Sequence, residues 1–389
     1  MTYTRKENTV APRFTLGIEE EFQMVDRNTG QLASYIHPIL DKGTPLLGEH
    51  IKAEMLQSAV ETVTDVCPNI AAARLELQHL RSTLARLVEE EGLALISAGT
   101  HPLSRWQEQQ RTLNDRYEEL EEEFQDVGRS ILIFGLHIHV GIDSHDQAIP
   151  LMNQLRTWLP HLLALSSNSP FCAGRYSGLR SWRAVIWKRF PRSGIPPVFD
   201  STAKFDHYVN TLVQNGCIDN GKRIWWDIRP HPFFPTIEFR ICDMPATMED
   251  TLAITALCQA LVAKLTWLLK RNIMTCVLPA EYIEENKWRA MRYGLDTEIV
   301  DFSQNRRLSM RDSINELLDF VDDVLDDLGT RREINYLRML LDDPRGTGAD
   351  RQITLYEETG SLQAVTRYLM QQTVKGLTLN QVKIEQPGW

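Results

Sequence analysis

Every second residue from Leu132 to Ile142 is a large apolar one, and this period of two constrains the fold more than any other feature. Successive side chains of a strand point to opposite faces, so one face is continuously apolar and the other carries His137 and His139 between glycines. The apolar face has to pack on a hydrophobic layer. The glycines leave room for a ligand near the backbone. One such histidine would usually be structural, whereas two on one face make a functional site a serious alternative.

A second strand, expected at residues 14 to 25, has the same pattern near the N-terminus. Glu19 and Glu21 share one face, and the opposite face carries large apolar residues. Neighbouring carboxylates repel each other, and this strand would leave them partly desolvated unless a cation lies between them. The alternative is a strand whose polar face simply meets water.

Further strands are expected at residues 93 to 98, 130 to 142, 224 to 229 and 236 to 243. In the last two, charged residues of both signs fall on one face, which for an isolated strand could be surface ion pairs. The residues expected to share a face are Thr236, Glu238, Arg240 and Cys242 in one strand, and Trp225, Asp227 and Arg229 in the other.

Long helical patterns separate these strands. Helices are predicted at about residues 69 to 92, 104 to 127, 205 to 214, 252 to 269 and 311 to 328, with a Gly/Pro-punctuated loop at 342 to 349. The apolar helix at 252 to 269 is interrupted by Thr255, Gln259 and Lys264, which indicates a buried helix rather than a membrane span. No linker divides the chain, so we expect one α+β catalytic domain, with a core at 1–295 and a mostly helical flank at 296–389.

Composition excludes several classes of protein. The net charge of −10 argues against a nucleic-acid or anionic-membrane partner. The first 14 residues lack the apolar run of a signal peptide, and the six cysteines lack the spacing of a zinc site or a disulfide framework. A cytoplasmic protein is expected.

The polar residues together suit phosphoryl transfer. Glu19, Glu21, His137 and Glu238 offer hard oxygen donors and one imidazole, a set that favours Mg²⁺ or Mn²⁺. Three arginines, Arg183, Arg229 and Arg240, could hold phosphate or carboxylate with two hydrogen bonds each. The segment 216–222 matches the GxxxxGK spacing of a P-loop, but Arg223 replaces the Ser/Thr and a helical pattern precedes it, so an ordinary loop is expected.

Ordered motifs over most of the chain resemble the YbdK-type carboxylate–amine ligases, also called the type 2 glutamate–cysteine ligase family, within the glutamine synthetase superfamily. The motifs are TLGIEEEFQMVD, EMLQSAVETVTDVC, ISAGTHPLSRW, FGLHIHVGI, SGLRSWRAVIWKRFPRSGIPP, WWDIRPHP, TIEFRICD and MRYGL. Beyond residue 295 the likeness is looser.

The resemblance implies a glutamine-synthetase-like curved antiparallel sheet with flanking helices, around a site for ATP, divalent cations and an acid substrate. It implies nucleotide or phosphate contacts from His139 and Arg240, and substrate contacts from Arg183 and Arg229. By motif position the metal ligands are Glu19, Glu21, Glu54, Glu61, His137 and Glu238. Because Glu54 and Glu61 are seven residues apart, at least one should come from a loop or bend.

The expected reaction is ATP-dependent amide formation through an acyl phosphate, giving a γ-glutamyl amide as a glutamate–cysteine ligase does. The partners expected are a small amino acid and an amine, and the chain could form a homo-oligomer. Two alternatives stay open: a guanidino kinase-like phosphotransferase, which would release a stable phosphorylated product, and a non-catalytic nucleotide sensor. Four intact candidate metal ligands argue against the sensor.

Overall fold

A computed structural model describes residues 13–378, and the 1–12 and 379–389 segments, which include most of the stretch considered for a signal peptide, lie outside the described residues. Its centre is a seven-stranded antiparallel sheet in the order β10-β11-β5-β1-β3-β2, with β4 also paired to β1. The strands are β1 (Leu16–Asp26), β2 (Ile51–Ala53), β3 (Ala59–Val63), β4 (Leu93–Ile96), β5 (Gly135–Gly141), β10 (Ile228–Pro230) and β11 (Thr236–Asp243). The predicted antiparallel sheet is confirmed.

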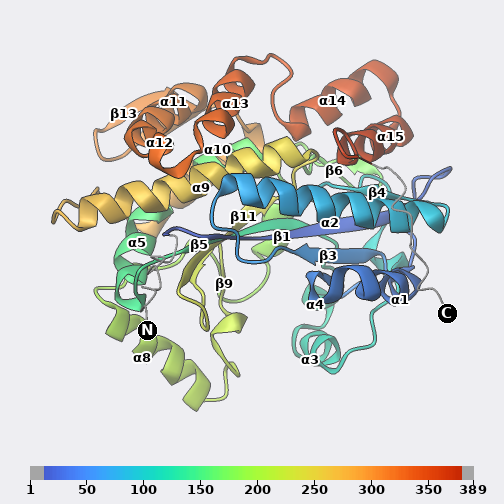
Figure 1. The fold of residues 1–389 in the computed structure, drawn as a ribbon, viewed down its shortest axis with the longest axis horizontal. Helices are drawn as coiled ribbons and strands as arrows, with labels where there is room; N and C mark the ends of the chain where they lie inside the picture. The colour runs from blue at the N-terminus through green and yellow to red at the C-terminus, as the bar shows by residue number, and fades with distance from the viewer. Residues whose placement is uncertain (1–12, 379–389) are drawn as a thin grey trace, which may run out of the picture.

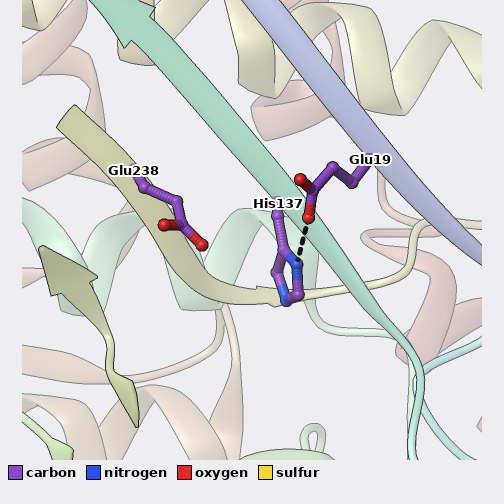
Figure 2. A group of neighbouring side chains, drawn as sticks. All are labelled: Glu19, His137 and Glu238. Carbon is purple, nitrogen blue, oxygen red and sulfur yellow. Dashed lines mark hydrogen bonds and ion pairs between the residues drawn. The ribbon is translucent and has the colours of Figure 1, made fainter. Parts of the chain in front are cut away.

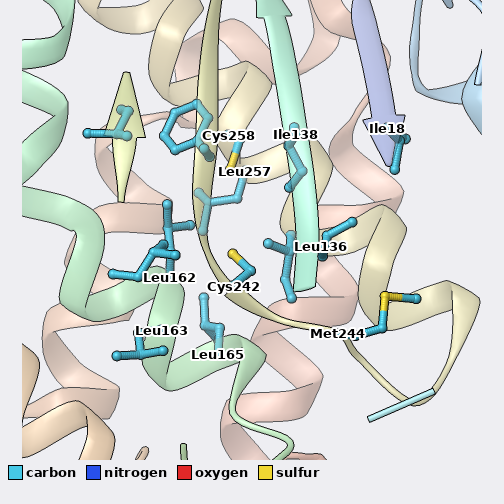
Figure 3. Close-up of a cluster of buried hydrophobic side chains, with 14 of the residues drawn as sticks. Ile18, Leu136, Ile138, Leu162, Leu163, Leu165, Cys242, Met244, Leu257 and Cys258 are labelled. Atoms are coloured by element: carbon cyan, nitrogen blue, oxygen red, sulfur yellow. The ribbon is translucent and has the colours of Figure 1, made fainter. Parts of the chain in front are cut away.

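One face of the sheet forms the hydrophobic core. Ile18, Leu136 and Ile138 are fully buried there (Figure 3). The long helices α2 (Ile70–Glu90) and α9 (Met248–Leu269) lie side by side across this face (Figure 1), and α5 (Ala148–Leu155) and α6 (Leu159–Ser166) cover the β5 and β11 side. The opposite, polar face remains available for a site.

The sequence located the two long core helices correctly. Asn69 caps α2 by accepting a hydrogen bond from the Ala72 amide, and Thr247 caps α9 in the same way through the Asp250 amide. Within the described residues, α9 is the one helix long and apolar enough to cross a membrane, but 83% of its most apolar window is buried inside the protein. It is a core helix, as predicted.

The prediction of one helix over 104–127 is wrong. Residues 110–112 instead run beside 55–57, where the Gln57 and Thr112 amides donate to backbone carbonyls across the pair. This pairing uses the backbone groups that a helix would need. Two shorter helices follow, α3 (Asp115–Phe124) and α4 (Asp126–Arg129).

The strand predictions were too long or too regular in three places. Residues 130–134 are not strand, and β5 begins at Gly135. The 224–229 strand breaks into β9 (Trp225–Trp226) and β10, because the Asp227 carboxylate turns away to pair with the buried amine of Lys287, at 2.6 Å. Asp227 therefore does not share the polar face with Arg229.

Cys242 does not share the polar face with Glu238 and Arg240 either. The register of β11 on β5 shifts between Phe239 and Cys242, which is a β-bulge. A bulge inserts one residue, so the residues after it point to the opposite face from the one that strict alternation predicts. Cys242 accordingly lies in the hydrophobic core, fully buried near Leu136 (Figure 3).

Helices after residue 295 pack outside α9 and α2 (Figure 1). The predicted helix 311–328 is interrupted at residues 322–324, and the loop predicted at 342–349 lies mostly before α14. The division into a core and a flank within one domain stays a prediction. The remaining elements are α1 (Ile36–Leu47), α7 (Arg183–Trp187), α8 (Thr202–Gln214), α10 (Ala280–Tyr293), α11 (Met310–Phe320), α12 (Leu325–Leu328), α13 (Arg331–Asp342), α14 (Gly348–Thr359), α15 (Leu362–Thr373), β6 (Phe171–Cys172), β7 (Arg175–Tyr176), β8 (Ser193–Gly194), β12 (Glu298–Asp301) and β13 (Arg306–Ser309).

Candidate active site

A cavity of about 340 Å³ lies on the polar face of the sheet, and all ten residues expected from the sequence line it. They come from the strands β1, β3, β5, β10 and β11, from the loop after β2 and from α7. These residues are Glu19, Glu21, Glu54, Glu61, His137, His139, Arg183, Arg229, Glu238 and Arg240.

The antiparallel register explains why residues so distant in sequence meet here. Glu21 pairs with Glu61 on one side, and Glu19 pairs with His137 on the other. Further across the sheet, His139 pairs with Glu238, which in turn pairs with Arg229. Directly paired residues point to the same face and bring their Cβ atoms to about 4.5–5.5 Å. The polar face is therefore a row of adjoining charged side chains.

Glu19 links the two histidines. Its Oε2 lies 3.0 Å from His137 Nδ1, as Figure 2 shows, and its Oε1 lies 3.2 Å from His139 Nε2. Glu238, on β11, directs its carboxylate toward His137 from the far side (Figure 2). His137 Nε2 lies 4.0 Å from the nearer Glu21 oxygen. Because His137 donates a hydrogen bond from Nδ1 to the Glu19 carboxylate, its Nε2 keeps a lone pair for a ligand.

The acids at the β1 and β3 end repel one another. Burial and then the charges of Glu19, Glu54 and Glu21 hold the pKa of Glu61 well above its usual value. Burial also raises the pKa of Glu21, against the opposing effect of Arg183. Buried carboxylates with this few positive neighbours are stabilised by a cation.

The pKa values of the two histidines shift in opposite directions. Burial and the nearby Arg240 lower the pKa of His137 to about 4, so it is neutral at pH 7. Burial also disfavours the charged form of His139, but its hydrogen bond to Glu19 and the charge of Glu238 outweigh this and raise its pKa. His137 is thus a possible metal ligand, and the upward shift of the His139 pKa favours its protonated form, which suits phosphate.

At the other end of the row, Glu238 is already neutralised by two arginines. Arg229 donates to both its oxygens, at 2.8 and 3.1 Å, and Arg240 donates from Nη1 to one of them. The carboxylate is buried, but these two guanidinium groups hold its pKa below the usual range. Arg229 also donates to the carbonyls of Lys222 and Ile224. Its hydrogen-bonding capacity is mostly used inside the protein.

In the cavity, two groups of side chains bring three potential ligand atoms within 4.8 Å of one another, and they share His137; a third such group, His50, Asp65 and Glu76, lies outside it. The first is Glu19, His137 and Glu238, and the second is Glu21, Glu61 and His137. Carboxylate oxygens with one imidazole suit Mg²⁺ or Mn²⁺, and the raised pKa of Glu61 fits a cation at the second group. Glu54 follows β2 in a loop, as its spacing from Glu61 predicted, but it belongs to neither group.

Comparison with known proteins gives the family. The sequence model described as "Glutamate-cysteine ligase family 2 (GCS2)" matches residues 15–368. Relatives named "Putative glutamate--cysteine ligase 2" are 48% identical, in Solibacter usitatus over 95% of this chain and 96% of the relative, and in Sorangium cellulosum over 96% and 100%. The chain belongs to glutamate–cysteine ligase family 2. Membership makes it an ATP-dependent ligase.

Solved structures agree on the fold of this family. A glutamate–cysteine ligase from Francisella tularensis, solved in complex with AMP, superposes with a TM-score of 0.67 at 14% identity, covering 93% of this chain and 89% of that one. A bifunctional glutathione synthetase from Pasteurella multocida gives 0.68 at 16% identity, covering 93% of this chain and 51% of the other. Both comparisons support the α+β fold class.

Several cavity residues of this family member were missed by sequence reasoning. Lys222 belongs to the loop dismissed as a P-loop, yet it is exposed and lines the cavity, as does the buried His231. Tyr117 and Trp187 also line the cavity. None of these lies on a strand with alternating polarity, so periodicity had no signal for them. The unusual density of tryptophan around residues 182–226 was the available hint.

Proposed function

We propose that this chain activates the side-chain carboxylate of glutamate with ATP and joins it to an amine, forming a γ-glutamyl amide as the names of its relatives suggest. The observation that carries the proposal is the row of side chains on the polar face. At one end of the row the carboxylates have too few positively charged neighbours to balance them. Arginines lie at the other end, and His137 lies between the two. A reaction that moves a phosphoryl group needs both kinds of charge side by side.

Mg²⁺ or Mn²⁺ fits either ligand group. Because neutral His137 has one lone pair, it would complete one group at a time, either with Glu19 and Glu238 or with Glu21 and Glu61. When bound, the cations would neutralise phosphate oxygens and the repelling carboxylates. Glu54 lines the same wall and is the remaining metal ligand that we propose. The donor set of hard oxygens and one neutral imidazole supports this choice.

The arginines and His139 act on phosphate in this proposal. Arg240 uses Nη1 for Glu238, while its buried Nε has no partner among the described residues and no described residue accepts a hydrogen bond from its Nη2. The raised pKa of His139 favours its protonated form, which would supply a second positive charge. These groups would stabilise the oxygens of the γ-phosphate while the substrate carboxylate attacks its phosphorus and the bond to the ADP oxygen breaks.

The amine then attacks the carbonyl carbon of the acyl phosphate. The C–O bond to phosphate breaks, phosphate leaves with an oxygen of the original carboxylate, and one proton is released from the amine. None of the cavity residues needs to form a covalent bond with the substrate. The acidic net charge supports small-molecule rather than nucleic-acid substrates, and a cytoplasmic location is part of the proposal.

ADP release tests the proposal. The assay compares glutamate alone, cysteine or another amine alone, and both together, at saturating Mg²⁺. We expect fast release only when acid and amine are both present, because the acyl phosphate needs the amine to turn over. ADP release that is indifferent to every acid and amine would contradict the ligase assignment to glutamate. A stable phosphorylated product would favour a phosphotransferase.

A further inference from the structure

A β-bulge in β11 lies directly opposite the central histidine of the site. Phe239 pairs with Ile138 and Cys242 with Leu136, so Arg240 and Ile241 together oppose His137. Bulges leave backbone groups without ladder partners and redirect the side chains beside them. Here Arg240 faces the cavity, while Cys242, two residues later, is buried in the core. Arg240 keeps the face that strict alternation gives it, but its backbone is part of the bulge, so the position of its side chain depends on how the bulged backbone is held.

Arg183 holds the two carbonyls of this bulge. Its Nη2 donates to the Arg240 carbonyl and its Nη1 to the Ile241 carbonyl, both at 3.2 Å. The Arg183 side chain is only 2% exposed, although it forms part of the cavity wall. Gly135 makes this possible, since a Cβ there would lie 2.3 Å from Arg183 Nη2.

The same short helix also contacts the side chain of Arg240. Trp187, one turn after Arg183 on α7, places its ring 5.6 Å from the Arg240 guanidinium carbon. The start of α7 is anchored to β11, because the buried Asp243 carboxylate accepts hydrogen bonds from the Ser169 and Ser181 hydroxyls, at 2.6 and 2.8 Å. The helix is fixed to the strand that it supports.

We propose that α7 is a positioning element for Arg240, in which Arg183 fixes the bulged backbone, Trp187 supports the guanidinium and neither residue binds substrate. This changes the role expected for Arg183 from its sequence motif, and it rests on the proposed phosphate contact of Arg240. Both terminal nitrogens of the buried Arg183 donate to backbone carbonyls, whereas Nη2 of Arg240 donates to no described residue.

A double-mutant cycle on ADP release tests this division of roles. Arg183→Gln should lower kcat on the order of 10²-fold, the cost of a misplaced catalytic group, with little change in the KM for the acid. Arg183→Gln combined with Arg240→Gln should be no slower than Arg240→Gln alone, since the first acts through the second. Arg183→Lys, which keeps donors, should recover part of the rate. The matched control is Arg189→Gln, an exposed arginine after α7, which should be unaffected.

The proposal would be overturned if the fold losses of kcat from the two single substitutions multiplied in the double variant. A higher KM for the acid with unchanged kcat in Arg183→Gln would also overturn it. Either result would mean that Arg183 contacts substrate itself.

Gly135→Ala provides a second test that leaves Arg183 and its charge in place. The added methyl should displace the guanidinium and reproduce the loss of kcat. Loss of the bulge should also bring Cys242 toward the cavity, where a small thiol reagent would label it faster than in the unmodified chain. Peptide mass spectrometry measures this labelling without any catalytic turnover. The result therefore tests the role of Arg183 even if the proposed function is wrong.

Cys258 is the internal control for that labelling. It is as fully buried as Cys242 but lies on α9 rather than on the bulged strand. We expect faster labelling of Cys242 alone in Arg183→Gln and Gly135→Ala, and not in Arg189→Gln. Unchanged labelling of Cys242 would overturn the proposal, because Arg183 would then not stabilise the bulge. Equal labelling of both cysteines would also overturn it, because the substitution would then have loosened the whole core.

Discussion

Three consecutive glutamates on β1 lie in two different environments. Glu20 points into the core, where it is fully buried and pairs with the equally buried Arg81 of α2. Arg81 also donates to the hydroxyl of Thr251 on α9. Glu19 and Glu21 point to the opposite face and line the cavity. One strand thus carries a structural carboxylate and two candidate functional ones.

The difference lies in how each charge is balanced. Glu20 has its own arginine, so its environment is complete without a ligand. Glu21 is next to Glu61, and burial together with like charge raises the pKa of both. Residue type is the same throughout, and only the parity of the strand separates the roles. Substitutions on either face of β1 therefore test this difference.

The largest effect on stability should come from the core side. Glu20→Gln leaves Arg81 as a buried unpaired charge, which typically costs about 3–5 kcal/mol. Urea unfolding should show this loss in the free energy of unfolding. Replacing the pair together, as Glu20→Leu with Arg81→Met, should recover most of it, because no charge is then stranded. If Glu20→Gln unfolds like the unmodified chain, the pair is not structural.

On the cavity side, Glu19→Gln should destroy activity and leave stability nearly unchanged. One carboxylate is lost from the first ligand group, so ADP release should fall on the order of 10²–10³-fold, as for other groups that stabilise a developing charge. Glu21→Gln should behave similarly through the second group. Unfolding in urea is the matched control. Near-normal turnover at saturating Mg²⁺ would mean that the cavity acids hold no cation.

Substitutions of the two histidines should affect metal binding and nucleotide binding separately. His137→Ala should raise the Mg²⁺ concentration needed for half-maximal rate, since His137 belongs to both ligand groups. His139→Ala should instead raise the KM for ATP by about tenfold, the equivalent of roughly 1.4 kcal/mol, with the metal requirement unchanged. Titrations of each variant against Mg²⁺ and ATP measure both quantities. Equal shifts in both titrations for both variants would refute this division.

The smallest effect should be a pH dependence of thermal stability, measured with a chelator present to remove metal ions. The folded pKa of Glu61 is raised well above 4.5, so the unfolded chain loses this proton first as pH rises. Ionising Glu61 in the folded protein then costs stability, and Tm should fall as pH increases from about 4.5 through the raised pKa. Glu61→Gln should reduce this slope, and Mg²⁺ should reduce it in the unmodified chain. An identical slope in Glu61→Gln would locate the effect elsewhere.

Alternating polarity predicted the part of the site that lies on regular strands. Glu19, Glu21, His137 and His139 were placed on the correct face because β1 and β5 keep their period of two without interruption. Arg240 was also placed correctly, because the bulge in β11 comes immediately after it. The resemblance to the family supplied Glu54 and Glu61, which parity alone did not join to the others.

Where local regularity breaks, sequence reasoning failed. Cys242 was given the wrong face because a bulge has no signature in a single strand, and Asp227 because its partner Lys287 is sixty residues away. The helix expected over 104–127 lost its first half to backbone pairing with residues 55–57. In each case a tertiary contact, distant in sequence, outweighs the local pattern.

The central claim is that the cavity transfers a phosphoryl group to a carboxylate before the amine adds. Glutamate labelled with heavy oxygen in its side-chain carboxylate tests this directly, with mass analysis of the inorganic phosphate formed. We predict one labelled oxygen in phosphate for each amide made, because the carboxylate oxygen that attacks ATP leaves with the phosphoryl group. Phosphate without label, while amide is formed, would contradict the acyl phosphate.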